Sequence, residues 1–421
     1  MFDKTVLENG LRVVSSTLPH TRSVSINIFI GAGSRYESDD IAGVSHFLEH
    51  MLFKGTKRRP TAREISEEIE GIGGIMNAGT DKELTVYWAK VGDHRFAATL
   101  DILADSLLNS LLDPEELEKE RQVILEELAM TEDSPADMVN ILIDEVVWPH
   151  QPLGRDTGGT PDSVKATTRD DVIRYLHQLY VPQNTVVAVA GNVTHQEVVD
   201  RVTENLGGWE SRPFGTWYPA QIPNDTPRLR LRSKKTEQAH FCLATPGLSA
   251  AHPDRYVLDV LNAVLGEGMS SRLFLEIREK RSLCYDVHSY VNHYLDTGST
   301  VVNAGVDPRK LDEALRATID ELHKMVDGSV PEKELTKAKE FIKGRLQLRM
   351  EDTRAVASWL GGQELLRREI LTVDEVLQIV EDVTAESLQR VARDLWRSEA
   401  FRLAVVGPFR SETRFQKLLA A

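Results

Sequence analysis

The 421-residue sequence is poor in cysteine, with only Cys242 and Cys284. Two thiols are too few for a disulfide framework or a cysteine-based zinc site, and they favour a reducing compartment. No run of about 18 apolar residues offers a membrane-spanning helix. The first residues read as a strand, an Asn-Gly turn and a second strand, without the basic and apolar segments of an export signal. We therefore expect a cytoplasmic protein without a membrane anchor.

Basic residues are outnumbered, since 50 Lys and Arg face 65 Asp and Glu and give a formal net charge of −15. A general nucleic-acid binder needs clustered Lys and Arg, so this class is excluded. The acidic surface either suits basic or neutral partners or merely keeps the protein soluble. With 41% hydrophobic and 27% charged residues, the composition is that of an ordinary globular protein. The length favours two or more domains.

Strand-like and helix-like segments alternate along the chain, which predicts a mixed α/β (α+β) fold. Period-two alternation indicates strands, and a period near 3.6 indicates amphipathic helices. The expected strands cover residues 23–33, 83–91 and 184–193. The expected helices cover residues 43–53, 61–72, 94–110, 114–131 and 168–180.

The two halves of the chain resemble each other in the same order, which indicates an internal duplication. Residues 25–40 match 239–254, residues 113–133 match 330–352, and residues 184–193 match 401–409. A segment rich in proline and glycine separates the halves and is the best candidate for a linker. We expect an N-terminal domain at 1–210, a linker at 211–228 and a C-terminal domain at 229–421.

The stretch SHFLEHMLF, residues 45–53, places two histidines and a glutamate in an apolar helical segment. His46 and His50 are one turn apart on one face, and Glu49 falls on the same side. This spacing lets a helix offer two imidazole nitrogens to a tetrahedral metal, with Glu49 as a third ligand or a base. The alternative is a partly buried, hydrogen-bonded histidine pair with Glu49 in a surface ion pair. The second half has LNAVLGEGM instead, so the site belongs to the first half.

A catalytic zinc usually takes three protein ligands, so a further carboxylate is expected. In PEELEKERQVILEELAM, Glu120 and Glu127 project along the flank of the apolar stripe, whereas Glu126 points toward solvent. Glu127 is the expected ligand, and Glu120, two turns earlier, is a plausible partner for a ligating histidine. The alternative is a merely solvated acidic face.

His46-x-x-Glu49-His50, together with ERQVILEEL downstream, resembles the inverted zinc motif of the pitrilysin/insulinase family of metallopeptidases, the inverzincins. The resemblance implies that His46, His50 and Glu127 bind one Zn²⁺ per chain. It implies that Glu49 is the general base that activates water and that Glu120 supports a ligand. It also implies two similar domains, each a mostly antiparallel sheet packed with helices, that form half of a clamshell chamber.

Two further segments resemble substrate-contacting parts of that family. GGIMNAGT, residues 73–80, otherwise a Gly-rich turn before a strand, resembles a strand that pairs with substrate backbone and places Asn77 and Ala78 at the peptide. SRLFLEIREKRSLCYDV, residues 271–287, otherwise an amphipathic helix, loop and strand, resembles the segment with an Arg and Tyr pair. Arg278 and Tyr285 match it, and both could donate hydrogen bonds to the substrate or its oxyanion.

The resemblance implies a zinc endopeptidase for short unstructured peptides. Family members of about twice this length hold both halves of a chamber, so we expect a homodimer with catalysis across the subunit interface. The expected partners are a peptide substrate and a second copy, with no nucleic acid and no membrane. One alternative is a processing peptidase for presequences, related to the mitochondrial processing peptidase. Another is a catalytically inactive structural subunit of the respiratory core-protein type. Cobalt or manganese would also suit the His-His-Glu set.

Overall fold

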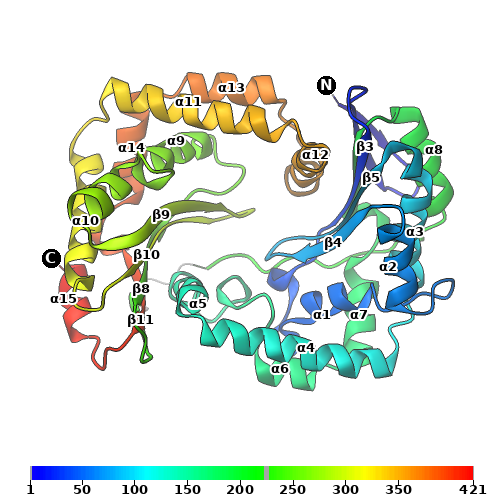
Figure 1. Cartoon of the computed structure of the whole chain (residues 1–421), viewed down its shortest axis with the longest axis horizontal. Coiled ribbons are helices and arrows are strands. Elements are labelled where there is room, and N and C mark those ends of the chain that lie inside the picture. The colour runs from blue at the N-terminus through cyan, green and yellow to red at the C-terminus, as the bar shows by residue number, and fades with distance from the viewer. Residues whose placement is uncertain (1, 222–226, 421) are drawn as a thin grey trace. The chain divides into compact units, whose positions relative to one another are not determined.

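The computed structural model describes residues 2–221 and 227–420 and divides into two compact units (Figure 1). Unit 1 comprises Met1–Leu128, Asp156–Tyr218 and Gln347–Thr372. Unit 2 comprises Ala129–Arg155, Pro219–Leu346 and Val373–Ala421. Within the described residues, no helix has the length and apolar character needed to cross a bilayer.

Unit 1 contains a sheet with strand order β1-β2-β6-β3-β5-β4. β2 and β6 run parallel, and the other neighbouring strands pair antiparallel. β4 therefore forms one edge of the sheet. The strand bounds are β1 Asp3–Val6, β2 Arg12–Thr17, β3 Ser23–Ile30, β4 Ile75–Thr80, β5 Thr85–Gly92 and β6 Thr185–Gly191.

Helices cover both faces of this sheet, because alternate side chains of the central strands are apolar on both sides. On one face, Val24, Ile26 and Ile28 of β3 join the large core with α1, α3, α7 and α8. On the other face, Phe29 packs with α12, which lies beside β3 (Figure 1). The helices of unit 1 are α1 Val44–Met51, α2 Ala62–Glu70, α3 Phe96–Asn109, most of α4 Pro114–Asp133, α6 Pro161–Ala166, α7 Arg169–Leu179, α8 His195–Leu206 and α12 Thr353–Arg367.

Unit 2 contains a second sheet with strand order β7-β11-β8-β10-β9. Its strands are β7 Leu229–Ser233, β8 Ala239–Pro246, β9 Cys284–His293, β10 Gly298–Val306 and β11 Arg402–Gly407. Its helices are α5 Pro135–Val147, α9 Arg255–Gly266, α10 Leu311–Asp327, most of α11 Glu332–Arg349, α13 Val373–Glu381, α14 Ala385–Leu395 and α15 Thr413–Ala420.

The second sheet has the same strand arrangement as the first without β1. Its strands β7, β11, β8, β10 and β9 take the positions of β2, β6, β3, β5 and β4. The repeat extends to strand direction, since β7 and β11 run parallel as β2 and β6 do. β8 and β11 fall in the segments that match β3 and β6 in sequence, and α11 falls in the segment that matches α4. The predicted duplication, mixed α/β class and mostly antiparallel sheets are confirmed.

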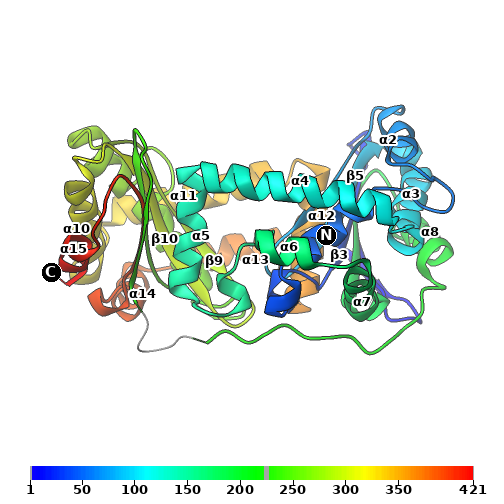
Figure 2. The ribbon, with the colours of Figure 1, turned by 90° about the horizontal axis from the view of Figure 1, so that it is seen from below.

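The compact units interleave the two halves of the sequence, because each half contributes one helix to the other unit. α12, from the second half, packs on β3 and β6 of unit 1. Its Gly361 allows this approach, since a Cβ there would lie 2.3 Å from a ring atom of Phe29. α5, from the first half, packs on β8 and β11. Figure 2 shows α5 beside the sheet of unit 2, in which β9 and β10 are labelled. The contiguous domains expected at 1–210 and 229–421 therefore do not coincide with the compact units.

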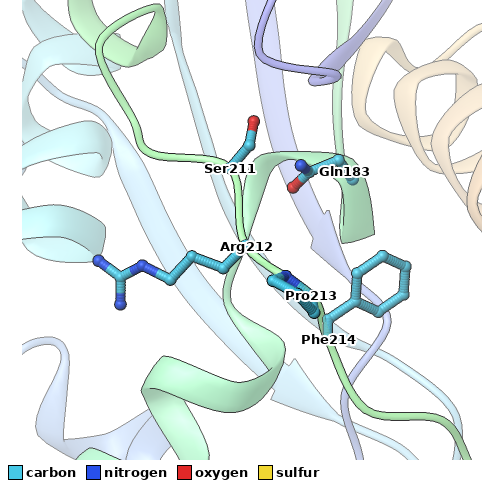
Figure 3. Close-up of a pocket in the computed structure, with 5 residues that line it drawn as sticks. All are labelled: Gln183, Ser211, Arg212, Pro213 and Phe214. Carbon is cyan, nitrogen blue, oxygen red and sulfur yellow. The ribbon is translucent and has the colours of Figure 1, made fainter.

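In the expected linker at 211–228, residues up to Tyr218 belong to unit 1 and the described residues from Pro219 onward belong to unit 2, while residues 222–226 lie outside the described residues. The Tyr218 backbone N–H donates to the Arg35 carbonyl at 3.1 Å, and the Arg35 side-chain Nε donates to the Tyr218 carbonyl at 3.0 Å. The Arg35 guanidinium also stands 4.3 Å from the ring centroid of Trp217. The same segment borders a surface pocket of about 490 Å³ (Figure 3), lined by Gln183, Ser211, Arg212, Pro213 and Phe214.

Candidate metal centre

Helix α1 carries the histidine motif and is fixed by its buried face and its N-terminus. Val44, Phe47, Leu48 and Met51 are buried, which leaves His46, Glu49 and His50 on the more accessible face. The carboxylate of Glu37 accepts the backbone N–H groups of Gly43 and Ser45 at 2.7 and 2.8 Å. A carboxylate at this end satisfies donors that the helix leaves free and opposes the positive end of its dipole.

Close backbone packing also holds the start of α1. Gly43 has φ +92°, and a Cβ there would lie 2.4 Å from the carbonyl oxygen of Gly158. Gly159 has φ +80°, and its Cβ would lie 2.3 Å from the carbonyl oxygen of Ala42. Both positions need glycine for conformation and for space. The loop after residue 155 is thereby held against the helix that carries the histidines.

Three ligand atoms converge between α1 and α4. The Nε2 atoms of His46 and His50 are 3.2 Å apart, and Glu127 Oε2 lies 3.7 and 3.8 Å from them. In a tetrahedral zinc site with bonds of about 2.0–2.1 Å, ligand atoms lie about 3.3 Å apart. The three side chains therefore fit a zinc ion without rearrangement of the backbone. Among the described residues, this is the one group of His, Cys, Asp and Glu side chains that meets the spacing of a metal site.

The three α4 glutamates Glu120, Glu126 and Glu127 differ in exposure and in their contacts with the histidines. The Glu127 side chain is 45% exposed and faces the two imidazoles, whereas the Glu126 residue is exposed. Glu120, two turns earlier, is 6% exposed and its Oε2 lies 3.0 Å from His50 Nδ1. With Nε2 directed at the metal position, Nδ1 carries the proton and its N–H donates a hydrogen bond to the Glu120 carboxylate. Glu120 thus fixes both the tautomer and the ring orientation of His50.

His46 has a different environment. Burial and the adjacent imidazole of His50 lower the pKa of His46, while Glu49 and Asp156 act in the opposite direction. The neutral imidazole is the form that binds a metal. Its Nδ1 is buried without a hydrogen-bond partner in the structure, so this ring lacks the support that Glu120 gives His50.

Glu49 stands outside the group of ligand atoms. Its Oε2 accepts a hydrogen bond from the Thr80 hydroxyl at the end of β4. Because Thr80 contacts Oε2, Oε1 can accept a hydrogen bond from a water molecule. The local arrangement allows Glu49 to act as a base while the histidines and Glu127 hold the metal.

Asn77 and Ala78 lie in β4, the edge strand of the sheet of unit 1. β4 pairs with β5 along one side, and Asn77 is exposed. The Asn77 side-chain oxygen accepts the N–H of Ala78 at 2.7 Å. An edge strand presents backbone donors and acceptors that an extended peptide can join. Thr80 belongs to the same strand, which links this edge to Glu49.

Arg278 and Tyr285 belong to unit 2, whereas the metal ligands belong to unit 1. The Arg278 guanidinium lies 5.0 Å from the ring centroid of Tyr285 and 4.6 Å from that of Phe274. Tyr285 is 78% exposed. The expected helix, loop and strand are present, but the helix is wound as a π-helix over Phe274–Lys280, with Phe274 and Ile277 buried, and β9 follows it. π-helical turns are rare and frequently occur at functional sites.

Comparisons with known proteins show which family the chain belongs to. The family described as "Insulinase (Peptidase family M16)" matches residues 12–161, and the one described as "Peptidase M16 inactive domain" matches residues 166–342. The chain belongs to the M16 peptidase family. It is 39% identical over 415 residues to "Uncharacterized zinc protease SCO5738" of Streptomyces coelicolor, covering 97% of this chain and 90% of that protein. It is 38% identical over 408 residues to "Uncharacterized zinc protease YmxG" of Bacillus subtilis, covering 97% and 98%.

Solved structures share the fold at lower identity. A protease from Helicobacter pylori superposes with a TM-score of 0.90 at 24% identity, covering 97% of this chain and 99% of that one. A chain of Complex III2 from Candida albicans gives a TM-score of 0.85 at 20% identity, covering 99% of each chain. At this identity the likeness shows the fold. The family resemblance predicted from the zinc motif is confirmed by the relatives at higher identity.

Two residues beside the metal centre were not predicted from the sequence. Lys54 contacts Glu120, and Thr80 contacts Glu49. Lys54 could have been found, since it continues the four-residue spacing of His46 and His50 toward the same neighbouring helix. Thr80 could not, because its contact depends on β4 lying beside α1.

Proposed function

We propose that the chain is a zinc-dependent endopeptidase that hydrolyses short, unstructured peptides. The observation that carries this proposal is the convergence of His46 Nε2, His50 Nε2 and Glu127 Oε2, with Glu49 close by but outside that group. Three ligands leave the fourth position that a catalytic zinc needs. Two relatives carry the name "Uncharacterized zinc protease", which supports the same activity.

The mechanism assigns separate tasks to the side chains. His46, His50 and Glu127 would hold the zinc, and Glu120 orients His50 through Nδ1. Zinc, when bound, supplies a Lewis acid that brings the pKa of water to about 7 and polarises the scissile carbonyl. Glu49 accepts a proton from the attacking water and returns it to the leaving amine.

The edge strand β4 supports extended peptides as the substrate class. Backbone pairing to Asn77 and Ala78 requires a peptide that can add as a strand, and it places few demands on side chains. Arg278 and Tyr285 are proposed to donate hydrogen bonds to the bound peptide or to the oxyanion. Cleavage should therefore depend on chain flexibility more than on sequence.

Digestion of a mixture of unstructured peptides, followed by mass spectrometry, tests this proposal. We expect internal cleavage at varied sequences, no cleavage of a stably folded protein, loss of activity with a zinc chelator, and recovery when zinc is restored. Cleavage confined to N-terminal, basic presequences would favour the processing peptidase, whose substrates suit a net charge of −15. A zinc-loaded protein that cleaves neither class would favour the inactive structural subunit and contradict the proposal.

We also propose a homodimer with catalysis across the subunit interface, located in the cytoplasm. The support is that the metal ligands and the Arg278 and Tyr285 pair occur in one short chain. Mixing an inactive Glu49→Gln chain with an inactive Arg278→Ala chain should restore part of the activity, because each mixed dimer combines the intact metal centre of one subunit with the intact Arg278 and Tyr285 pair of the other. Absence of recovery despite demonstrated subunit exchange would contradict catalysis across the interface.

A further inference from the structure

Lys54 reaches the same buried carboxylate that supports His50. Its Nζ lies 2.6 Å from Glu120 Oε1, while His50 Nδ1 lies 3.0 Å from Glu120 Oε2. Lys54 follows α1 by three residues, and its backbone N–H donates to the Met51 carbonyl at 3.2 Å. The lysine is therefore held by its backbone as well as by its ammonium group.

The two oxygens of Glu120 have separate partners. The Glu120 side chain is 8% exposed and that of Lys54 is 26% exposed, so this pair is largely removed from solvent. A buried carboxylate is costly unless a cation and hydrogen bonds satisfy it. Because Lys54 occupies Oε1, the carboxylate group is held with Oε2 toward the imidazole. Without that contact, Glu120 could turn toward solvent and release the His50 N–H.

We propose that Lys54 is a positioning residue of the metal centre: it holds Glu120 in the orientation in which Glu120 orients His50 for the metal. This inference rests on the proposed function, since it needs a metal at His46, His50 and Glu127. In this arrangement Lys54 holds Glu120, Glu120 orients His50, and His50 binds the metal. The competing explanation is that the Lys54–Glu120 pair only joins α1 to α4 and has no effect on the metal.

Zinc affinity separates the two explanations. The full chain is stripped of metal, and the zinc dissociation constant is measured by competition with a chromophoric chelator. Loss of a group that supports a ligand from the outside costs about 10–100-fold in metal affinity. We expect Lys54→Met to weaken zinc binding by about 10-fold, and Lys54→Arg, which keeps the cation, to restore most of the affinity. Lys57→Met is the matched control, because Lys57 is an exposed lysine three residues away.

A double-substitution cycle tests whether Lys54 acts through Glu120. In the Glu120→Gln background, Lys54→Met should cause no further loss of zinc affinity, because the carboxylate that it orients is gone. Thermal unfolding of the metal-free variants reports any change in the fold, and Lys54→Gln replaces Lys54→Met if the latter does not fold. An unchanged zinc affinity in Lys54→Met, or equal losses in both backgrounds, would overturn the positioning role alone. Wild-type protein that binds no zinc would instead overturn the proposed metal centre and, with it, this inference.

Discussion

Glu49→Gln should abolish most peptide hydrolysis while the protein keeps its zinc. The amide has nearly the same size as the carboxylate and can still contact Thr80, but it cannot accept the proton of the attacking water. General acid-base groups contribute about 10²–10⁴-fold to rate, so kcat should fall by that order. Hydrolysis of a quenched fluorescent peptide measures the rate, and metal analysis of the same sample measures zinc per chain.

The zinc content decides how such a loss is interpreted. Glu49 lies outside the three converging ligand atoms, so about one zinc per chain should remain in the Glu49→Gln protein. Loss of zinc together with activity would show that Glu49 is a ligand and not the base. Undiminished cleavage by a fully substituted sample would remove Glu49 from the mechanism.

Glu127→Gln should lose both the metal and the activity. The substitution removes the one anionic ligand of the group and leaves two neutral imidazoles. Because loss of an outer supporting group alone costs about 10–100-fold, loss of this ligand should weaken zinc binding by at least about 100-fold. Chelator competition measures the affinity, and peptide hydrolysis at low free zinc measures the activity.

Glu126→Gln is the matched control on the same helix. It makes the same chemical change one residue away, at an exposed position, and should leave zinc affinity and hydrolysis near the wild-type values. Equal effects of the two substitutions would indicate a general electrostatic effect of the acidic helix. An effect of Glu126→Gln alone would indicate that Glu126, and not Glu127, is the metal ligand.

Local pattern predicted most elements of the fold. The helical period of α1 and α4 predicted these helices within a few residues, because each buries one face. β3 is buried on both faces, and its alternation arises because Ser25 and Asn27 hydrogen-bond to α12 on one face while apolar side chains fill the core on the other. The exchange of α5 and α12 could not be predicted, since amphipathic helices show that a face is buried but not which sheet buries it. The π-helix at Phe274–Lys280 also leaves no distinctive pattern in the sequence.

In the candidate site, too, local pattern predicted some features, whereas tertiary packing determined others. The spacing of His46 and His50 and the helix face of Glu127 are local, so the sequence could indicate them. The distances between α1 and α4 that bring these side chains within reach of one ion depend on tertiary packing. The contact of Thr80 with Glu49 requires the edge strand to lie beside α1, which depends on sheet order and not on local pattern.

The central claim is that His46, His50 and Glu127 hold a zinc ion for peptide hydrolysis. Anomalous X-ray scattering at the zinc edge, recorded from crystals of the zinc-loaded full chain, tests it most directly. We expect one strong peak per chain in contact with His46 Nε2, His50 Nε2 and Glu127, with Glu49 outside the bonding distance of about 2.2 Å. A peak at other residues, or no peak at these three under saturating zinc, would contradict it.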